Sequence, residues 1–150
     1  MAQTRLDVRA VPIPQGIADL AGAFHLFLVW TGPDGKEIFF RGGPGNPNLG
    51  PLDEDSMNFK AIYCNWGPYI PGSIDWNPNA KSVTAAVGYG PETYQKLVTV
   101  CQSINFMGIG YRPLGPNSNT VAMTLLAKLG IAPKKPDAYT PGWDLPPLVR

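Results

Sequence analysis

The chain has 150 residues, a net charge of +1, 44% hydrophobic residues and only 15% charged residues. This length fits one domain spanning residues 1–150, with a single hydrophobic core. Near-neutral charge without a polybasic run excludes strong electrostatic binding to nucleic acid or to an anionic membrane, and no apolar run reaches the roughly 18 residues that a transmembrane segment needs.

The N-terminal segment predicts a half-buried strand. Leu6, Val8 and Ala10 alternate with polar residues, which is the period of a strand, and Pro12 and Pro14 end the pattern. The segment lacks the apolar centre of a signal peptide. We therefore expect synthesis in the cytoplasm, with export open only to a signal-independent secretion system.

A β-hairpin is the clearest local prediction. Residues 25–30, His-Leu-Phe-Leu-Val-Trp, form the first strand, and residues 31–35 supply Pro and Asp-Gly turn chemistry. The return strand covers residues 36–41. Gly42-Gly43-Pro44-Gly45 is expected to break it, and residues 44–56 are expected to form a polar loop.

The middle of the chain predicts two further strands separated by a long loop. The strands are residues 59–64 and 82–89, and the loop is residues 65–80. Long loops in compact domains are often functional. The loop aromatics are candidates for a substrate groove, although they can equally pin the loop to the core. These groove candidates are Trp66, Tyr69 and Trp76.

Two helices are predicted near the C-terminus. The first begins at Pro91, with Glu92 in its first turn, and ends near Gly108. The second runs from about Asn119 to Leu129. Residues 131–150 contain five prolines and are expected to lie on the domain as an extended tail. The fold class expected is therefore α+β, with a small antiparallel sheet packed against two or three helices.

The two cysteines, Cys64 and Cys101, fit no zinc or redox spacing. Two reduced, partly buried thiols are the favoured interpretation, and a disulfide or a reactive thiol remain alternatives. Cys64, at a strand end, is a weak alternative nucleophile, whereas Cys101 falls on the apolar face of the first helix. With one histidine in the chain, and with the acidic residues 53–55 typical of a solvated loop, we expect no metal and no cofactor.

One pair of residues has the chemistry of a hydrolase. His25 opens a strand, and Ser118 precedes a predicted helix. A hydroxyl at a helix N-terminus lies beside unpaired backbone N–H groups, which are able to stabilise an oxyanion, and an imidazole that titrates near pH 6.5 is able to take its proton. The N–H groups of Asn119 and Thr120 are the expected oxyanion donors, with Asn117 shaping the site.

The order of these motifs resembles the circularly permuted papain-like superfamily, which includes NlpC-like, lecithin-retinol-acyltransferase-like and PPPDE-type proteins. The resemblance rests on a strand beginning with His25, an intervening helix, then Tyr111 and the segment Asn117-Ser118-Asn119-Thr120-Val121 at a helix start. It implies that His25 is the base and that Ser118 occupies the position of the usual cysteine. It also implies an orienting group on the neighbouring strand, where Glu37 is the most plausible residue.

The activity that the resemblance implies is hydrolysis or acyl transfer at an amide or ester bond, in a peptide, in peptidoglycan or in a lipid. It further suggests a bacterial peptidoglycan-targeting or toxin-type effector domain, neutralised by an immunity or inhibitor protein. The alternative function is a catalytically inactive binding module on the same scaffold, which would use the aromatic loop at residues 65–80.

The same residues also have purely structural interpretations. Ser118 is a good helix N-cap, Asn117 and Asn119 are ordinary turn and cap residues, and a lone histidine on an apolar strand is often a satisfied core residue. A serine that replaces a native cysteine at position 118 is a further alternative. The spatial relation of His25 to Ser118 decides between these interpretations.

Overall fold

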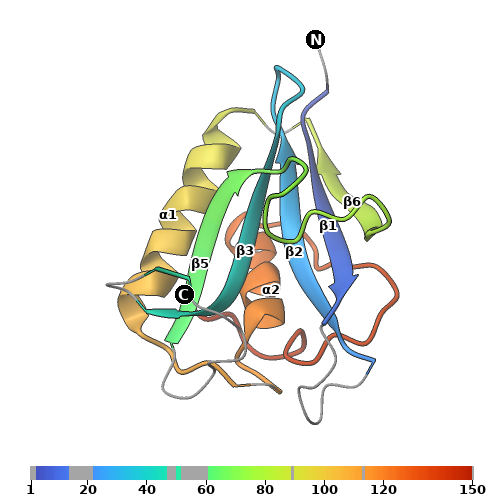
Figure 1. Cartoon of the computed structure of the whole chain (residues 1–150). Helices are drawn as coiled ribbons and strands as arrows, with labels where there is room; N and C mark the ends of the chain where they lie inside the picture. The colour runs from blue at the N-terminus through green and yellow to red at the C-terminus, as the bar shows by residue number, and fades with distance from the viewer. Residues whose placement is uncertain are drawn as a thin grey trace.

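The computed structural model describes residues 3–13, 22–46, 50–51, 61–88, 90–112 and 114–149. The strands are β1 (Arg5–Pro12), β2 (Phe24–Thr31), β3 (Glu37–Asn46), β4 (Gly50–Pro51), β5 (Ala61–Pro68) and β6 (Lys81–Val87), and the helices are α1 (Glu92–Met107) and α2 (Ser118–Lys128) (Figure 1). The predicted α+β class is confirmed. In the part of the chain so described, neither helix is long and apolar enough to cross a bilayer.

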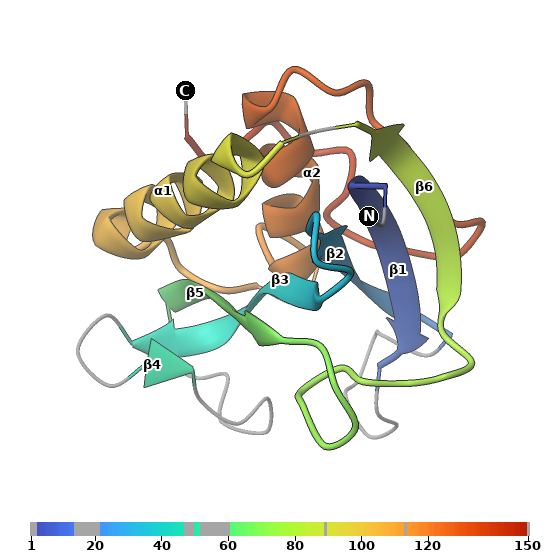
Figure 2. The same cartoon turned by 90° about the horizontal axis from the view of Figure 1, so that it is seen from above.

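All pairings between named strands are antiparallel. β1 lies between β2 and β6, β2 pairs with β3, and β3 pairs with β5 and, at its end, with the short β4. Both helices lie on one face of this sheet, and the segment between β5 and β6 crosses the other face (Figures 1 and 2). We call this segment, residues 69–80, the crossing segment.

The apolar run of β2 is explained by burial on both of its faces. Leu26, Leu28 and Trp30 belong to the core beneath the helices. Phe27 and Val29 face the opposite side, where they form a second buried cluster that includes Tyr69 of the crossing segment. A strand covered on both faces carries apolar residues at successive positions instead of alternating.

β3 is longer than the sequence predicted. Gly42, Gly43, Pro44 and Gly45 were expected to break it, yet they continue the strand and pair with Cys64, Tyr63, Ile62 and Ala61 of β5. The residue at position 42 must be small because a Cβ there would overlap the side chain of Val121 on α2. The glycine therefore permits close approach of the helix to the sheet, which is a second use of strand glycine besides ending a strand.

Replacing Gly42 by alanine is expected to destabilise the protein by about 1–3 kcal/mol, because an added methyl group in a filled core displaces its neighbours. Urea denaturation measures this change in the free energy of unfolding. Gly22→Ala is not a matched control because Gly22 has a positive φ of 78°. Gly110→Ala is suitable, since no atom lies within 4 Å of its added Cβ. An equal effect at positions 42 and 110 would contradict the close-approach explanation.

α1 ends at Gly108, as predicted, and a disulfide joins it to the sheet. Gly108 adopts the left-handed conformation, with φ 63°. Cys101 of α1 is bonded to Cys64 of β5, so the interpretation of two reduced thiols is wrong. Asn105, one helical turn after Cys101, also bonds the backbone N and O of Cys64. Cys64 is fully buried and has no thiol, so it does not fit a nucleophile's role.

The start of α2 occupies a split in the sheet between β2 and β3. Pairing of these strands runs from Thr31 opposite Glu37 to Leu28 opposite Phe40. Before Leu28, the side chain of Asn119 takes the place of a strand partner. Its Oδ1 accepts from the backbone N of Leu26 at 2.8 Å, and its Nδ2 donates to the backbone O of Phe24 at 3.0 Å. These bonds fix the helix N-terminus beside the start of β2.

The C-terminal tail lies against this same helix end. The backbone N of Phe24 donates to the backbone O of Tyr139 in the tail at 2.7 Å. Thr120 Oγ1 donates to the backbone O of Gly142 at 2.8 Å. Farther along, the backbone N of Leu148 donates to Thr124 Oγ1 at 3.0 Å. The tail therefore fixes both α2 and the first residue of β2.

Candidate active site

His25 and Ser118, which are ninety-three positions apart in the sequence, meet through their side chains. The Nδ1 of His25 lies 2.9 Å from the Oγ of Ser118. The Nε2 of the same ring lies 2.7 Å from Oδ2 of Asp75, which comes from the crossing segment. Ser118 and His25 are each 4% exposed. Hydroxyl, imidazole and carboxylate thus form one continuous hydrogen-bonded chain.

The hydrogen-bond partners define which nitrogen of the neutral His25 ring carries the proton. An ionised carboxylate only accepts hydrogen bonds, so the bond to Asp75 requires a proton on Nε2. Nδ1 is then unprotonated and accepts a hydrogen bond from the Ser118 hydroxyl. This is the arrangement in which an imidazole is able to act as a base toward serine, although in the best-known serine protease triad it is Nε2 that faces the hydroxyl.

Arg41 holds the carboxylate from the other side. The Nε of Arg41 donates to Oδ2 of Asp75 at 2.7 Å, so one carboxylate oxygen accepts from both the guanidinium and the imidazole. The side chain of Arg41 is 3% exposed and that of Asp75 is 11% exposed. A guanidinium is permanently charged, so this buried pair fixes the carboxylate as an anion beside the imidazole.

The backbone of Asp75 is held in an uncommon conformation. Its φ is 65°, and it is the one residue other than glycine with positive φ in the described part of the chain. Aspartate tolerates this region better than most residues, and such positions cluster at functional sites. The turn that produces it is closed by the backbone N of Trp76, which donates to Ser73 O at 3.1 Å.

The surroundings of Asp75 lower its pKa. Burial by itself raises the pKa of the carboxyl, but the charge and hydrogen bond of His25, together with those of Arg41, outweigh burial. The net result is a pKa well below the ordinary value of 3.8. The carboxylate is therefore ionised throughout the pH range in which an imidazole titrates.

The lowered pKa of Asp75 predicts that the free energy of unfolding decreases in acid. Because the folded-state pKa of Asp75 is depressed, its stabilisation is complete above the unfolded pKa of about 3.9 and is lost as pH falls toward the folded value. In that window the protein loses up to about 1.4 kcal/mol per pH unit through this group. Asp75→Asn is expected to flatten the dependence of unfolding free energy on pH below about 4. Identical slopes in urea titrations of the two proteins would contradict it.

Asn117, and not Ser118, caps α2. The side chain of Asn117 accepts from the backbone N of Asn119 at 2.9 Å and of Thr120 at 3.4 Å, and the Thr120 hydroxyl completes a capping box. The N-cap interpretation of Ser118 is thus wrong, since Ser118 is the first helical residue and its hydroxyl contacts His25 instead. Because Asn117 caps the helix, the hydroxyl of Ser118 is available for its hydrogen bond to His25.

The same capping changes the expected oxyanion donors. The N–H groups of Asn119 and Thr120 already donate to Asn117, so they do not provide the free donors that the sequence suggested. No acceptor within the described ranges takes the backbone N–H of Ser118. This N–H, next to the Ser118 hydroxyl at the positive end of a helix, is the donor that remains.

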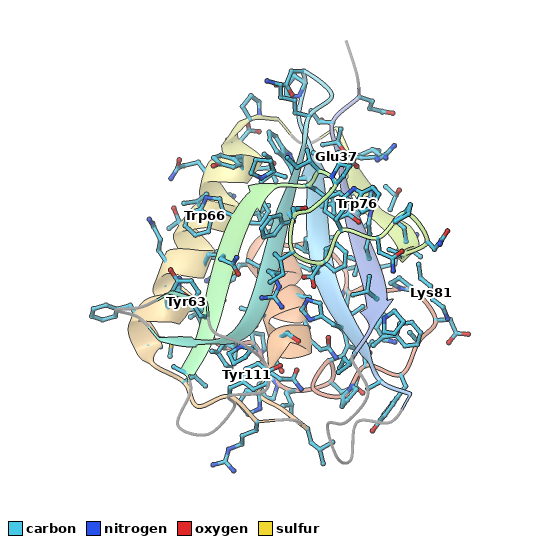
Figure 3. The ribbon with its side chains drawn as sticks, viewed as in Figure 1. Glu37, Tyr63, Trp66, Trp76, Lys81 and Tyr111 are labelled. Carbon is cyan, nitrogen blue, oxygen red and sulfur yellow. A yellow bond between two sulfur atoms is a disulfide. The ribbon has the colours of Figure 1, made fainter. Side chains whose placement is uncertain are left out.

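Glu37 does not orient the imidazole. Its carboxylate accepts from Arg9 Nη2 at 2.9 Å, at the turn end of the hairpin, where Glu37 pairs with Thr31. His25 is six residues from Thr31 along β2, which is about 20 Å of strand. In Figure 3, Glu37 and Tyr111 lie at opposite ends of the sheet. Asp75 occupies the position expected for Glu37 because the crossing segment passes over the start of β2.

The four aromatic site candidates do not line one groove. Trp66 stacks on Phe40 in the core beneath the helices, with ring centroids 6.4 Å apart, and Tyr111 packs against this same core. Tyr69 is buried beside Phe27 on the other face. Among the four, only Trp76 is exposed. Trp66 and Tyr69 therefore fit the interpretation that these aromatic residues hold their segment to the core better than they fit substrate contact.

Two residues of the site, Arg41 and Asp75, were not predicted, and only Arg41 could have been found from the sequence. Arg41 lies opposite the start of β2 in the predicted hairpin, so its proximity to His25 was inferable. Asp75 lies fifty positions from His25 in a loop with no periodic pattern, and nothing local marked it. The acidic residues 53–55 lie outside the described residues. No group of three or more potential metal ligands occurs among the residues that are described.

Comparison of the chain with protein-family models, with curated proteins and with solved structures finds no match.

Proposed function

We propose that the protein is a serine-dependent hydrolase or acyltransferase that cleaves an amide or ester bond. The observation that carries the proposal is the chain from the Ser118 hydroxyl through His25 to Asp75, with contacts of 2.9 and 2.7 Å. A nucleophile within reach of a base, with the base oriented by a third group, is the diagnostic arrangement for covalent catalysis.

In the first half of the reaction, Ser118 Oγ attacks the substrate carbonyl carbon while its proton moves to Nδ1 of His25. The imidazolium is stabilised by the Asp75 carboxylate. The Ser118 backbone N–H donates to the developing oxyanion, a type of contact typically worth about 2.7–4 kcal/mol. Collapse of the intermediate breaks the bond to the leaving group, which takes the proton from Nδ1, and an acyl-serine remains.

In the second half, His25 accepts a proton from water, or from an acceptor alcohol or amine. The oxygen or nitrogen of that molecule attacks the acyl carbon, the bond to Ser118 Oγ breaks, and Oγ recovers its proton from Nδ1. Water gives hydrolysis and another nucleophile gives acyl transfer. Arg41 is a positioning residue in this scheme, because it contacts Asp75 and not the reacting atoms.

The order of strand histidine, helix and helix-start nucleophile supports placement of the chain among permuted papain-like proteins, with serine in the usual cysteine position. On that basis we extend the proposal to peptide, peptidoglycan or lipid substrates, and to a bacterial effector domain with an immunity or inhibitor protein as partner. The aromatic contacts of Trp66 and Tyr69 with the core weigh against the alternative of a binding module that uses the aromatic loop.

A fluorophosphonate probe tests the proposed chemistry, because it forms a covalent bond with an activated serine far faster than with an ordinary hydroxyl group. We expect one adduct per chain, located at Ser118 by peptide mass analysis. Ser118→Ala is expected to abolish labelling, and His25→Ala is expected to slow it at least 100-fold, which is the usual contribution of a general base. Ser103→Ala is a matched control, since Ser103 is exposed on α1.

Ser118→Cys provides an independent readout, because a thiol at this position should react with iodoacetamide faster than an ordinary free cysteine. The disulfide leaves no other described thiol to compete. Absence of fluorophosphonate labelling in the wild type, together with ordinary thiol reactivity in the folded Ser118→Cys variant, would overturn the proposed enzyme and favour the inactive binding module.

A further inference from the structure

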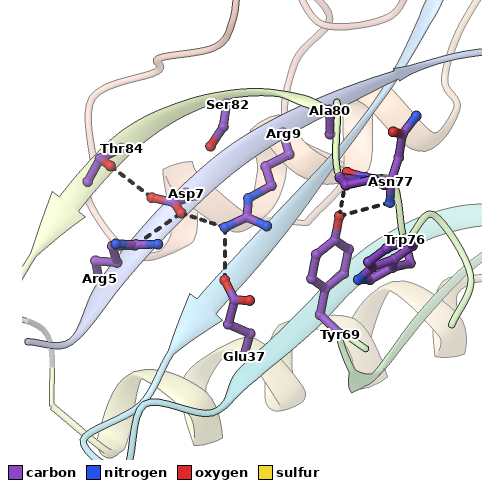
Figure 4. A pocket seen from close by; sticks show the side chains of 11 residues that line it. Arg5, Asp7, Arg9, Glu37, Tyr69, Trp76, Asn77, Ala80, Ser82 and Thr84 are labelled. Carbon is purple, nitrogen blue, oxygen red and sulfur yellow. Dashed lines mark hydrogen bonds and ion pairs between the residues drawn. The ribbon is translucent and has the colours of Figure 1, made fainter. Parts of the chain in front are cut away.

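A polar pocket of about 490 Å³ lies on the sheet face opposite the helices, beside the crossing segment (Figure 4). Its floor comes from β1, with walls from β6, the start of β3 and the crossing segment. This volume is typical of sites that hold small molecules. The site residues Ser118, His25 and Asp75 do not line it, so the pocket is separate from the proposed catalytic chain.

The charged side chains of the pocket balance one another. Asp7 Oδ2 accepts from Arg5 Nε at 3.2 Å and from Arg9 Nη2 at 2.9 Å, while Arg9 Nη2 also donates to Glu37 at 2.9 Å. Thr84 Oγ1 donates to the second oxygen of Asp7 at 2.8 Å. Two guanidinium groups thus face two carboxylates, and a charged ligand would meet no uncompensated opposite charge.

Unused hydrogen-bonding capacity nevertheless remains in the pocket. The Nε of Arg9 has no partner in the described part of the chain, but it is buried, so a ligand would reach the Arg9 side chain only through the 14% of it that is exposed. Burial would lower the pKa of Arg9, but its bond to Asp7 and the charge of Glu37 outweigh burial and raise it, so the guanidinium stays charged. Ser82 at the rim adds a hydroxyl that is able both to donate and to accept.

The aromatic side chains give the pocket one apolar wall. Trp76 lines it and is 37% exposed. Tyr69 is not free to stack on a ligand, because the guanidinium of Arg9 lies 5.1 Å from its ring centroid and its hydroxyl bonds Asn77. The Trp76 ring is therefore the aromatic surface accessible to a ligand, and Figure 4 draws it among the side chains that line the pocket.

From these observations we infer that the pocket binds an uncharged, hydroxyl-rich ligand, a saccharide unit. Hydroxyl groups both donate to carboxylates and accept from guanidinium N–H groups, so they suit a site where both signs of charge are present and balanced. The apolar C–H face of a sugar ring packs on Trp76. The inference is independent of catalysis, since the pocket shares no residue with the proposed catalytic chain.

The test is an NMR titration of Ser118→Ala protein, in which any cleavage of the ligand by the proposed triad is prevented. The neutral probes are cellotetraose and triacetylchitotriose, and the charged probes are trigalacturonate and the dipeptide Lys-Asp. We expect a neutral oligosaccharide to shift the Trp76 indole signal and the amide signals of β1 and β6. Trp76→Ala should weaken binding about tenfold or more, equivalent to about 1.4 kcal/mol. Trp76→Phe should retain most of it.

Phe106→Ala is the matched control, because Phe106 is a highly exposed aromatic on α1, away from the pocket. The inference is overturned if neither neutral oligosaccharide shifts these signals at tens of millimolar. Preferential binding of a charged probe also overturns it, as does binding that Trp76→Ala leaves unchanged. Absence of binding together with normal fluorophosphonate labelling would reject the saccharide site while leaving the proposed hydrolase intact.

Discussion

For the proposed hydrolase, Asp75→Asn is expected to lower kcat about 10²- to 10⁴-fold, measured under conditions in which the variant remains folded. An amide is nearly the same size as a carboxylate, but it carries no charge to stabilise the imidazolium. Arg41 Nε donates to the same side-chain oxygen that faces His25, so the amide oxygen of asparagine is expected to stay toward both groups and the loss to come from the missing charge. Initial rates on an activated ester measure the effect.

The control for this variant is Asp34→Asn, an identical chemical change in the exposed hairpin turn. Its rate should stay within about twofold of wild type, since exposed charges this far from a site are screened. A large loss of rate in Glu37→Gln with near-normal activity in Asp75→Asn would show that Glu37 orients the ring after all, in disagreement with the observed geometry.

Arg41→Met is expected to reduce the free energy of unfolding by about 3–5 kcal/mol. Methionine fills much of the same volume, but it leaves the Asp75 carboxylate buried without its guanidinium partner, and removal of one member of a buried pair has effects of this size. The Nε–Oδ2 contact of 2.7 Å and the 3% exposure of the Arg41 side chain place the pair in that class. Urea denaturation at pH 7 measures the change.

Arg5→Met is the comparison for stability. Arg5 also bonds an aspartate, Asp7 at 3.2 Å, but its side chain is 48% exposed. Exposed ion pairs contribute at most about 1 kcal/mol, so a loss no larger than this is expected. An equal loss of unfolding free energy in the two arginine variants would contradict a larger contribution of the buried Arg41–Asp75 pair to stability.

Most of the fold was predictable because its signals are local. The apolar run of β2, the turn chemistry after it, and the start and Gly108 end of α1 each occur within a few residues, and each was located correctly. The prediction failed at Gly42–Gly45. Glycine and proline usually interrupt a strand, but here a small residue is required by contact with Val121, nearly eighty positions away.

The prediction of two reduced cysteines failed for a related reason. Cys64 and Cys101 are separated by 37 residues, and the spacing of two cysteines does not fix the distance between them in space. Only the packing of α1 against β5 brings their Cα atoms to 5.0 Å, a separation within the range that a disulfide spans.

The sequence by itself determined the α+β class, the strand that carries His25 and the helix start that carries Ser118, because hydrophobic period, turns and helix ends are short-range features. Only the tertiary structure decided that these two side chains touch, that Asp75 and not Glu37 completes the chain, and that Asn117 takes the cap. The physical reason is that such contacts depend on where a helix enters the split between β2 and β3 and on how a loop crosses the sheet. Those arrangements follow from burial of the whole core, and no local pattern encodes them.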